Sequence, residues 1–119
     1  MNPKHIQAQK EGKVPFECIP MGPMAAVARV MKSGADKYGT RNWRKDAILA
    51  STYEGALGRH IFLEWASGVD RDADSGEHPL AHVIANCLVV LDAIAYDKLI
   101  DDRHRAETKE VANDTPDTP

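Results

Sequence analysis

With 119 residues and a formal net charge of −3, the chain has the length of a single domain. Its 15 Lys and Arg residues are spread along the sequence, which excludes the strongly basic surface typical of a duplex DNA-binding protein. No apolar run approaches the roughly 20 residues that span a bilayer, and the first residues lack an apolar signal core, so neither membrane insertion nor secretion is expected. Cys18 and Cys87 do not have the spacing of a metal or redox motif, so we expect buried, reduced thiols in a cytoplasmic protein.

The N-terminal residues divide into two short segments. Residues 1–13 are polar and have no hydrophobic periodicity, which predicts a flexible arm that becomes ordered only against a neighbouring subunit. Residues 14–20 combine two prolines with apolar side chains, which favours an extended strap over the core, anchored by Phe16 and Ile19. Residues 14–103 are therefore predicted to form the one helical domain.

Two helices are indicated by their start and stop signals. The first begins at Pro23, a residue suited to the first helical position, and ends at Gly34. The second begins at Ser51, which forms an S-x-x-E capping box with Glu54, and continues to Gly68.

A third helix is predicted from Pro79 to about Ile100, and it should be the central buried helix. Its broad apolar side is formed by Leu80, Ile84, Cys87, Leu88, Leu91 and Ile94. The fold class is therefore all-α, a small bundle of three to four main helices. Because so few helices bury little area, we expect a homodimer or homotetramer to complete the bundle. The charged, proline-rich residues 104–119 predict a disordered tail.

Polar residues on the second and third helices predict a metal site. His60 and Glu64 are four residues apart, as are His82 and Asn86, so each pair projects from one helical face. The loop between the helices adds three alternating aspartates, Asp70, Asp72 and Asp74. Oxygen ligands with some imidazole suit Mg²⁺ or Mn²⁺ better than a closed zinc site. An EF-hand is excluded because Ser75 replaces the invariant glycine of its loop, while simple solvation of the loop aspartates remains an alternative.

The segment between the first two helices is cationic and aromatic. It contains Lys37, Arg41, Arg44 and Lys45 together with Tyr38, Asn42 and Trp43. Arg and Lys can neutralise phosphate oxygens, while the aromatic rings can either stack on a base or fill the core.

Four stretches carry a family resemblance, in this order: VPFECIP, SGADKYGTRNWRK, ALGRH and DADSGEHPLAHVIANC. With them the chain resembles the small phage-associated proteins named dATP/dGTP diphosphohydrolases, which are functionally related to MazG-type pyrophosphohydrolases. The resemblance implies an all-α fold, a divalent cation, and hydrolysis of a purine deoxynucleoside triphosphate to the monophosphate and pyrophosphate. At two positions the chain departs from the residues that are common in this family. Val69 stands in place of an acidic residue, and Pro79 stands in place of a histidine, for which the neighbouring His78 is a candidate substitute. The E-E-x-x-E motif of the wider MazG group is absent, so its ligands cannot be transferred.

On this resemblance we hypothesise metal-assisted attack of water on the α-phosphorus. The metal ligands are sought among Glu64, Asp72, Asp74 and His82, with His60, Asp70 and Asn86 as further ligands or their supports. The base is one of Glu64, Asp74 and His78. The candidates that hold the triphosphate are Lys37, Arg41, Arg44 and Arg59, and those that contact the purine are Tyr38, Asn42 and Trp43.

The alternative hypothesis is a non-catalytic module. In it, the cationic segment binds a nucleotide or single-stranded nucleic acid, and the His and Asp cluster is a structural metal site.

Overall fold

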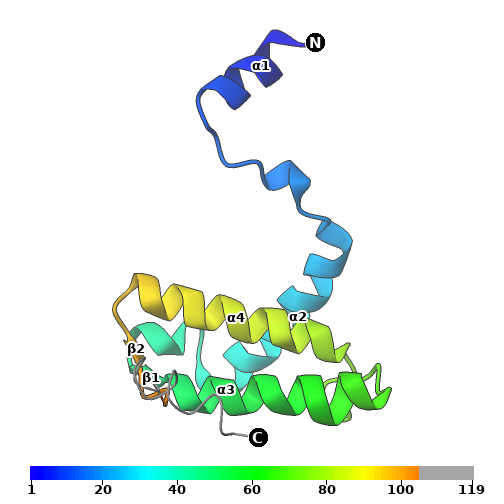
Figure 1. The fold of residues 1–119 in the computed structure, drawn as a ribbon, viewed down its shortest axis with the longest axis vertical. Helices are drawn as coiled ribbons and strands as arrows, with labels where there is room; N and C mark the ends of the chain where they lie inside the picture. Colours follow the sequence, from blue (N-terminus) through cyan, green and yellow to red (C-terminus); the bar gives the residue numbers. More distant parts are fainter. Residues whose placement is uncertain (105–119) are drawn as a thin grey trace, which may run out of the picture.

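The computed structural model describes residues 1–104 and is built almost entirely from helices (Figure 1). The predicted small helical bundle is confirmed. Its α-helices are α1 (Pro3–Lys10), α2 (Met21–Tyr38), α3 (Ala50–Gly58) and α4 (Pro79–Ala95). The shorter elements are η1 (Phe16–Cys18), η2 (Asn42–Arg44), the π-helix η3 (Arg59–Glu64), η4 (Trp65–Ser67), and strands β1 (Ile48–Leu49) and β2 (Leu99–Ile100). Within the described part of the chain, no helix has the length and apolar character needed to cross a membrane.

The core of the bundle is formed by small side chains on one face of α4. Ala81, Ala85, Val89 and Ala93 follow one another at intervals of four residues, and all four are buried. The first two pack against α2, and the last two pack against Trp43. Because alanine side chains are short, the neighbouring elements lie close to the α4 backbone.

Most of the large apolar side chains of α4 lie away from this alanine face, and Leu88 lies at its border. Ile84, Leu88, Leu91 and Ile94 are exposed, so the apolar side predicted to be buried was the wrong one. Both cysteines are exposed free thiols, which also corrects the prediction of buried ones. Helical periodicity identified an apolar helix, but it did not show which of its apolar faces the rest of the chain covers.

The predicted boundaries of α2 and α4 also need correction. α2 continues through Gly34 and ends before Gly39, whose φ of 95° stops the helix, so Lys37 and Tyr38 belong to its last turn. α4 ends at Ala95 rather than near Ile100, because the chain turns at Asp97, which has a φ of 56°. The turn leads into β2, which pairs with β1 in a parallel two-residue ladder.

The second predicted helix is interrupted. α3 begins at Ala50, and the hydroxyl and N–H of Ser51 donate to the carboxylate of Asp102, so the predicted capping box with Glu54 is absent. From Arg59 the helix widens into the π-helix η3, and the chain leaves the helical segment at Gly68 with a φ of 85°. A π-helical turn displaces the side chains that follow it, and such turns are frequent at functional sites.

Residues 1–20 lead away from the bundle instead of lying on it (Figure 1). The arm contains helix α1, which the sequence did not predict and which begins with Asn2 accepting a hydrogen bond from the N–H of Lys4. Phe16 and Ile19 are exposed, so the prediction of a strap anchored over the core was wrong. The predicted tail lies outside the described residues, apart from His104.

The alanine face predicts a sensitive position in α4. Ala93 is 0 % exposed, so Ala93→Leu should lower the free energy of unfolding by about 1–3 kcal/mol, because the added carbons have no space. Urea unfolding followed by circular dichroism measures this change. Ala25→Leu, at an exposed position of α2, is the matched control and should change stability little; equal effects at both positions would contradict the packing described.

Candidate functional site

Three ligand-type side chains meet where η3 faces the loop of residues 68–78. His60 Nδ1 lies 2.5 Å from Glu64 Oε1 and 3.7 Å from Asp72 Oδ2. One potential ligand atom from each of these three residues lies within 4.8 Å of the others. All three side chains are mostly withdrawn from solvent. This grouping is the part of the predicted metal site that the fold brings together.

Asp72 both shapes the loop and faces the cluster. Its Oδ1 accepts hydrogen bonds from the backbone N–H groups of Asp74 and Ser75, each at 2.9 Å, while Oδ2 is the atom nearest His60. Burial would raise the pKa of the Asp72 carboxyl, but hydrogen bonds from the backbone N–H groups of Ser75 and Asp74, together with a side-chain hydrogen bond shared with Glu64, hold that pKa below its ordinary value. Asp72 is therefore an ionised carboxylate in a largely dry position.

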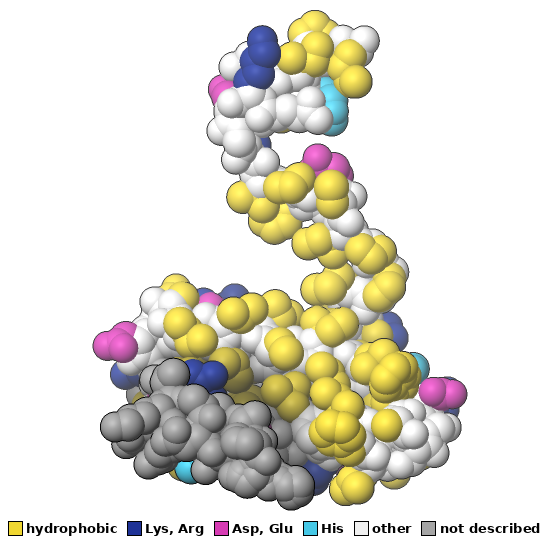
Figure 2. Space-filling model, in the orientation of Figure 1, with side chains coloured by type: hydrophobic (Ala, Val, Ile, Leu, Met, Phe, Trp, Pro, Cys, Tyr) yellow, Lys and Arg dark blue, Asp and Glu magenta, His cyan; other side chains and the backbone are white. Residues whose placement is uncertain are grey.

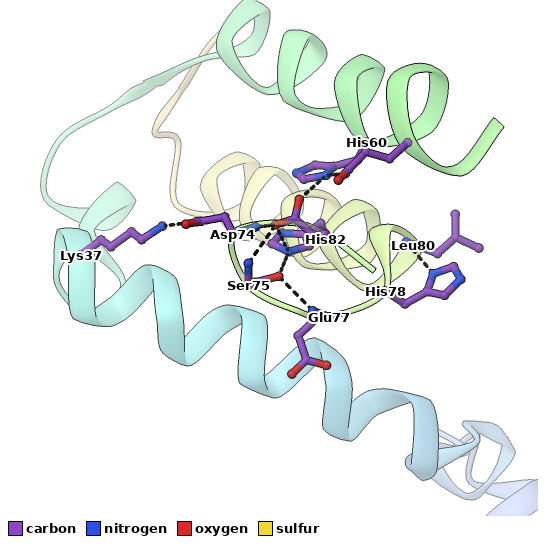
Figure 3. Close-up of polar contacts among 10 residues, drawn as sticks. Lys37, His60, Asp74, Ser75, Glu77, His78, Leu80 and His82 are labelled. Atoms are coloured by element: carbon purple, nitrogen blue, oxygen red, sulfur yellow. Dashed lines mark hydrogen bonds and ion pairs between the residues drawn. The ribbon is translucent and has the colours of Figure 1, made fainter. Parts of the chain in front are cut away.

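His82 reaches the same place from α4. Its ring stacks on that of His60, with centroids 4.4 Å apart and planes inclined by 15°. Its Nε2 lies 2.6 Å from the hydroxyl of Ser75, which also accepts a hydrogen bond from the N–H of Glu77 (Figure 3). Burial and the neighbouring His60 lower the pKa of His82. His82 is thus a neutral imidazole whose orientation is fixed by Ser75.

Two ion pairs tie the acidic loop to α2. Arg29 donates two hydrogen bonds to the Glu77 carboxylate, at 2.7 and 3.1 Å. Lys37 donates to Asp74 at 3.0 Å, and Figure 3 shows Asp74 beside His82. Asp74 is therefore placed toward the cationic end of α2, apart from the trio of His60, Glu64 and Asp72.

A cavity of about 710 Å³ connects the two predicted halves of the site. It lies between α2, the segment after α2, α3 and α4. The predicted site residues that line it are Lys37, Tyr38, Arg41, Asn42, Trp43, Arg44, His60, His82 and Asn86. The cationic segment and the imidazoles, which are far apart in the sequence, thus face one space.

Two residues of the cationic segment are used to anchor it. Trp43 is buried, and its Nε1 donates to Asp92 Oδ2 at 2.6 Å. Arg44 donates to both oxygens of Asp92, at 2.8 and 2.9 Å, and lies 4.0 Å over the Tyr96 ring. Trp43 therefore fills the core, as the sequence alternative allowed. Tyr38 and Arg41 are exposed residues at the cavity.

Three predicted site residues lie elsewhere. His78 Nδ1 accepts a hydrogen bond from the N–H of Leu80 at 3.0 Å and so caps α4. Figure 3 shows His78 and Leu80 away from His60 and His82. Asp70 is exposed, 3.7 Å from His78 Nε2. Arg59 is absent from the cavity lining and extends over Gly55, where its Nη1 would lie 3.2 Å from an added Cβ.

Two residues of the site were missed by the sequence reasoning. Ser75 was considered only as a departure from an EF-hand loop, and nothing in its neighbourhood indicated a contact with His82. Asp92 was not among the predicted site residues, although it is the one charged residue of the apolar helix α4. A carboxylate on such a helix requires a polar partner, which was the available signal.

The comparisons with known proteins agree with one another. Residues 3–103 match the family model described as dATP/dGTP diphosphohydrolase, N-terminal. The chain is 30 % identical over 93 residues to a dATP/dGTP diphosphohydrolase of Salmonella phage PMBT28. That alignment covers 78 % of this chain but 31 % of the relative, so the chain spans about a third of the relative's length. No solved structure gives a significant match.

The Asp92 contacts predict a pH-dependent contribution to stability. Hydrogen bonds from Arg44 and Trp43 lower the pKa of Asp92 from its ordinary 3.8 to about 2. The stabilisation is therefore complete above pH 3.8 and is lost as the pH falls through about 2. Asp92→Asn should lower the melting temperature at pH 7, and its difference from the wild type should shrink between pH 4 and pH 2.

The control is Asp36→Asn, which removes an exposed i,i+4 pair with Lys32 and should change the melting temperature little. Thermal unfolding followed by circular dichroism across this pH range measures both variants. A difference for Asp92→Asn that is independent of pH would contradict the ion pair as its cause.

Proposed function

The chain belongs to the dATP/dGTP diphosphohydrolase family, and on that premise we propose that it hydrolyses a purine deoxynucleoside triphosphate to the monophosphate and pyrophosphate. The observation that carries the proposal is the shared cavity, which joins the cations of residues 37–41 to the edge of the His60, Glu64 and Asp72 cluster. The purine preference and the products come from the family membership rather than from this geometry.

The cluster is suited to a divalent cation. Two carboxylates and one imidazole present ligand atoms within 4.8 Å of one another, and they are largely shielded from solvent. Their mixture of oxygen and nitrogen atoms fits Mg²⁺ or Mn²⁺. We propose His60, Glu64 and Asp72 as the ligands, with His82 stacked behind His60 to orient it. When bound, such a cation neutralises phosphate charge and lowers the pKa of a bound water.

The cationic side of the cavity would hold the triphosphate. Lys37 is half exposed and paired with a largely exposed Asp74, so their attraction is screened by water and Lys37 can exchange this partner for a phosphate. Arg41 lies beside it on the cavity lining, with a φ of 53° fixed by the tight turn after α2. Charge-assisted hydrogen bonds from both cations would stabilise the negative charge that develops on the phosphates.

The proton of the attacking water needs an acceptor. Glu64 is the predicted base that lies within the cluster, whereas Asp74 is paired with Lys37 and His78 caps α4. We therefore propose Glu64 for this role.

The test of the function is pyrophosphate release by the purified chain. Deoxy- and ribonucleoside triphosphates are supplied in turn, with Mg²⁺, with Mn²⁺, or with EDTA, and the nucleotide products are separated by chromatography. We expect dATP or dGTP to yield the monophosphate and pyrophosphate in the presence of metal, with loss of turnover in EDTA. Binding without turnover under every metal condition would instead support the nucleotide-binding module.

Substitutions within and beside the cluster separate its members. Glu64→Gln and Asp72→Asn keep the shape of the side chains, and the asparagine retains an Oδ1 acceptor for the loop. Each should reduce kcat by about 100-fold or more. Asp70→Asn is the matched control, because Asp70 is exposed and away from the trio, and it should keep nearly full activity. Loss of activity in Asp70→Asn, with activity retained in Asp72→Asn, would refute this assignment.

A further inference from the structure

The projecting arm carries apolar side chains that nothing in the described chain covers. Val14, Phe16, Ile19 and Met21 are 66, 69, 41 and 67 % exposed. Figure 2 shows hydrophobic side chains along nearly the whole projecting segment. Large apolar side chains gathered on one exposed segment mark an interaction surface more often than isolated ones do.

A second uncovered apolar surface lies on α4, and we call it the α4 outer face. It consists of Ile84, Cys87, Leu91 and Ile94, which follow one another at spacings of three, four and three and so form one stripe. Ile84, Leu91 and Ile94 are 41, 63 and 55 % exposed, and Cys87 is exposed as well. A helix that is apolar on all sides is normally buried.

We propose that two copies of this chain form a dimer in which residues 14–21 of each copy lie across the α4 outer face of the other. The arm and the face are both present in every copy. If two copies are related by a two-fold axis, the arm of each copy covers the α4 outer face of the other, and neither surface remains free for a third copy. The arm leads away from its own bundle (Figure 1); after the short turn η1 its backbone is extended at Ile19 and Pro20, which lead into α2.

The area available is sufficient for a specific dimer. Each large apolar side chain offers roughly 60–100 Å² of apolar surface. The four on each of two arms, with a matching area on the two receiving faces, give roughly 1,000–1,600 Å² in total. Specific interfaces begin at about 1,000 Å². The chain's own residues 104–119 are a poor alternative occupant, because Val111 is their one large apolar residue.

The two native cysteines provide a direct test with the unaltered chain. Cys18 lies in the arm and Cys87 in the α4 outer face, and both thiols are exposed. A short bismaleimide should join Cys18 of one copy to Cys87 of the other, giving a covalent dimer in a denaturing gel and a Cys18–Cys87 peptide by mass spectrometry. Cys18→Ser and Cys87→Ser should each remove that peptide. A linkage confined to one chain, or between two Cys87 residues, would overturn the proposal.

Light scattering on a size-exclusion column then tests the surfaces individually. Phe16→Glu and Leu91→Glu should each raise the dimer dissociation constant at least 100-fold, with an unchanged circular dichroism spectrum. Leu63→Glu is the matched control, because Leu63 is also 69 % exposed but lies on η3, and it should remain dimeric. A monomeric wild type, or a dimer disrupted by Leu63→Glu and not by Phe16→Glu, would refute the arm exchange.

Discussion

The fold depends on one constraint: the polar side chains on the apolar helix α4 require polar or aromatic contacts from other segments of the chain. His82 meets the Ser75 hydroxyl and the His60 ring, and Asp92 meets Trp43 and Arg44. Within the described residues, no buried side-chain polar atom lacks a partner. Because an unpaired polar group in an apolar interface costs more free energy than a hydrogen bond contributes, these contacts fix which segments lie against α4. The two segments so fixed supply the two halves of the site.

The π-helix η3 completes this arrangement from the other side. His60 and Glu64 both lie within it, and both face the loop that Asp72 organises. The loop is itself held on α2 through Arg29 and Glu77. Two members of the cluster are therefore supported from outside it: the His82 ring stacks on His60, and the N–H groups of Asp74 and Ser75 donate to Asp72. Such support is what a site needs if its charged groups are to stay in place when a charged ligand binds.

The distribution of apolar side chains connects the small core with the proposed dimer. The helices approach one another over alanines and valines, while phenylalanine, leucine and isoleucine side chains remain outside. A core of small residues contributes little hydrophobic free energy by itself, because that contribution scales with the apolar area removed from water. Association of two copies would bury the larger side chains and supply the area that a chain of this length lacks.

Much of this was available from the sequence, because helical periodicity and short-range spacing are local properties. They correctly indicated a helical bundle and placed His60 and Glu64 on one face and His82 on another. They also marked residues 37–45 as the cationic segment, and the four stretches that resemble the family led to its identification.

Tertiary structure decided which of these residues meet. His78 became a helix cap, Trp43 and Arg44 became anchors, and Asp92 became their common partner. The contacts of Trp43 and Arg44 with Asp92 join residues separated by almost fifty positions, and they depend on which face of α4 is covered. The sequence by itself determined the helical class of the fold and the chemical character of the site. Only the packing of the helices determined its members, because a pattern along one helix does not specify what lies opposite it.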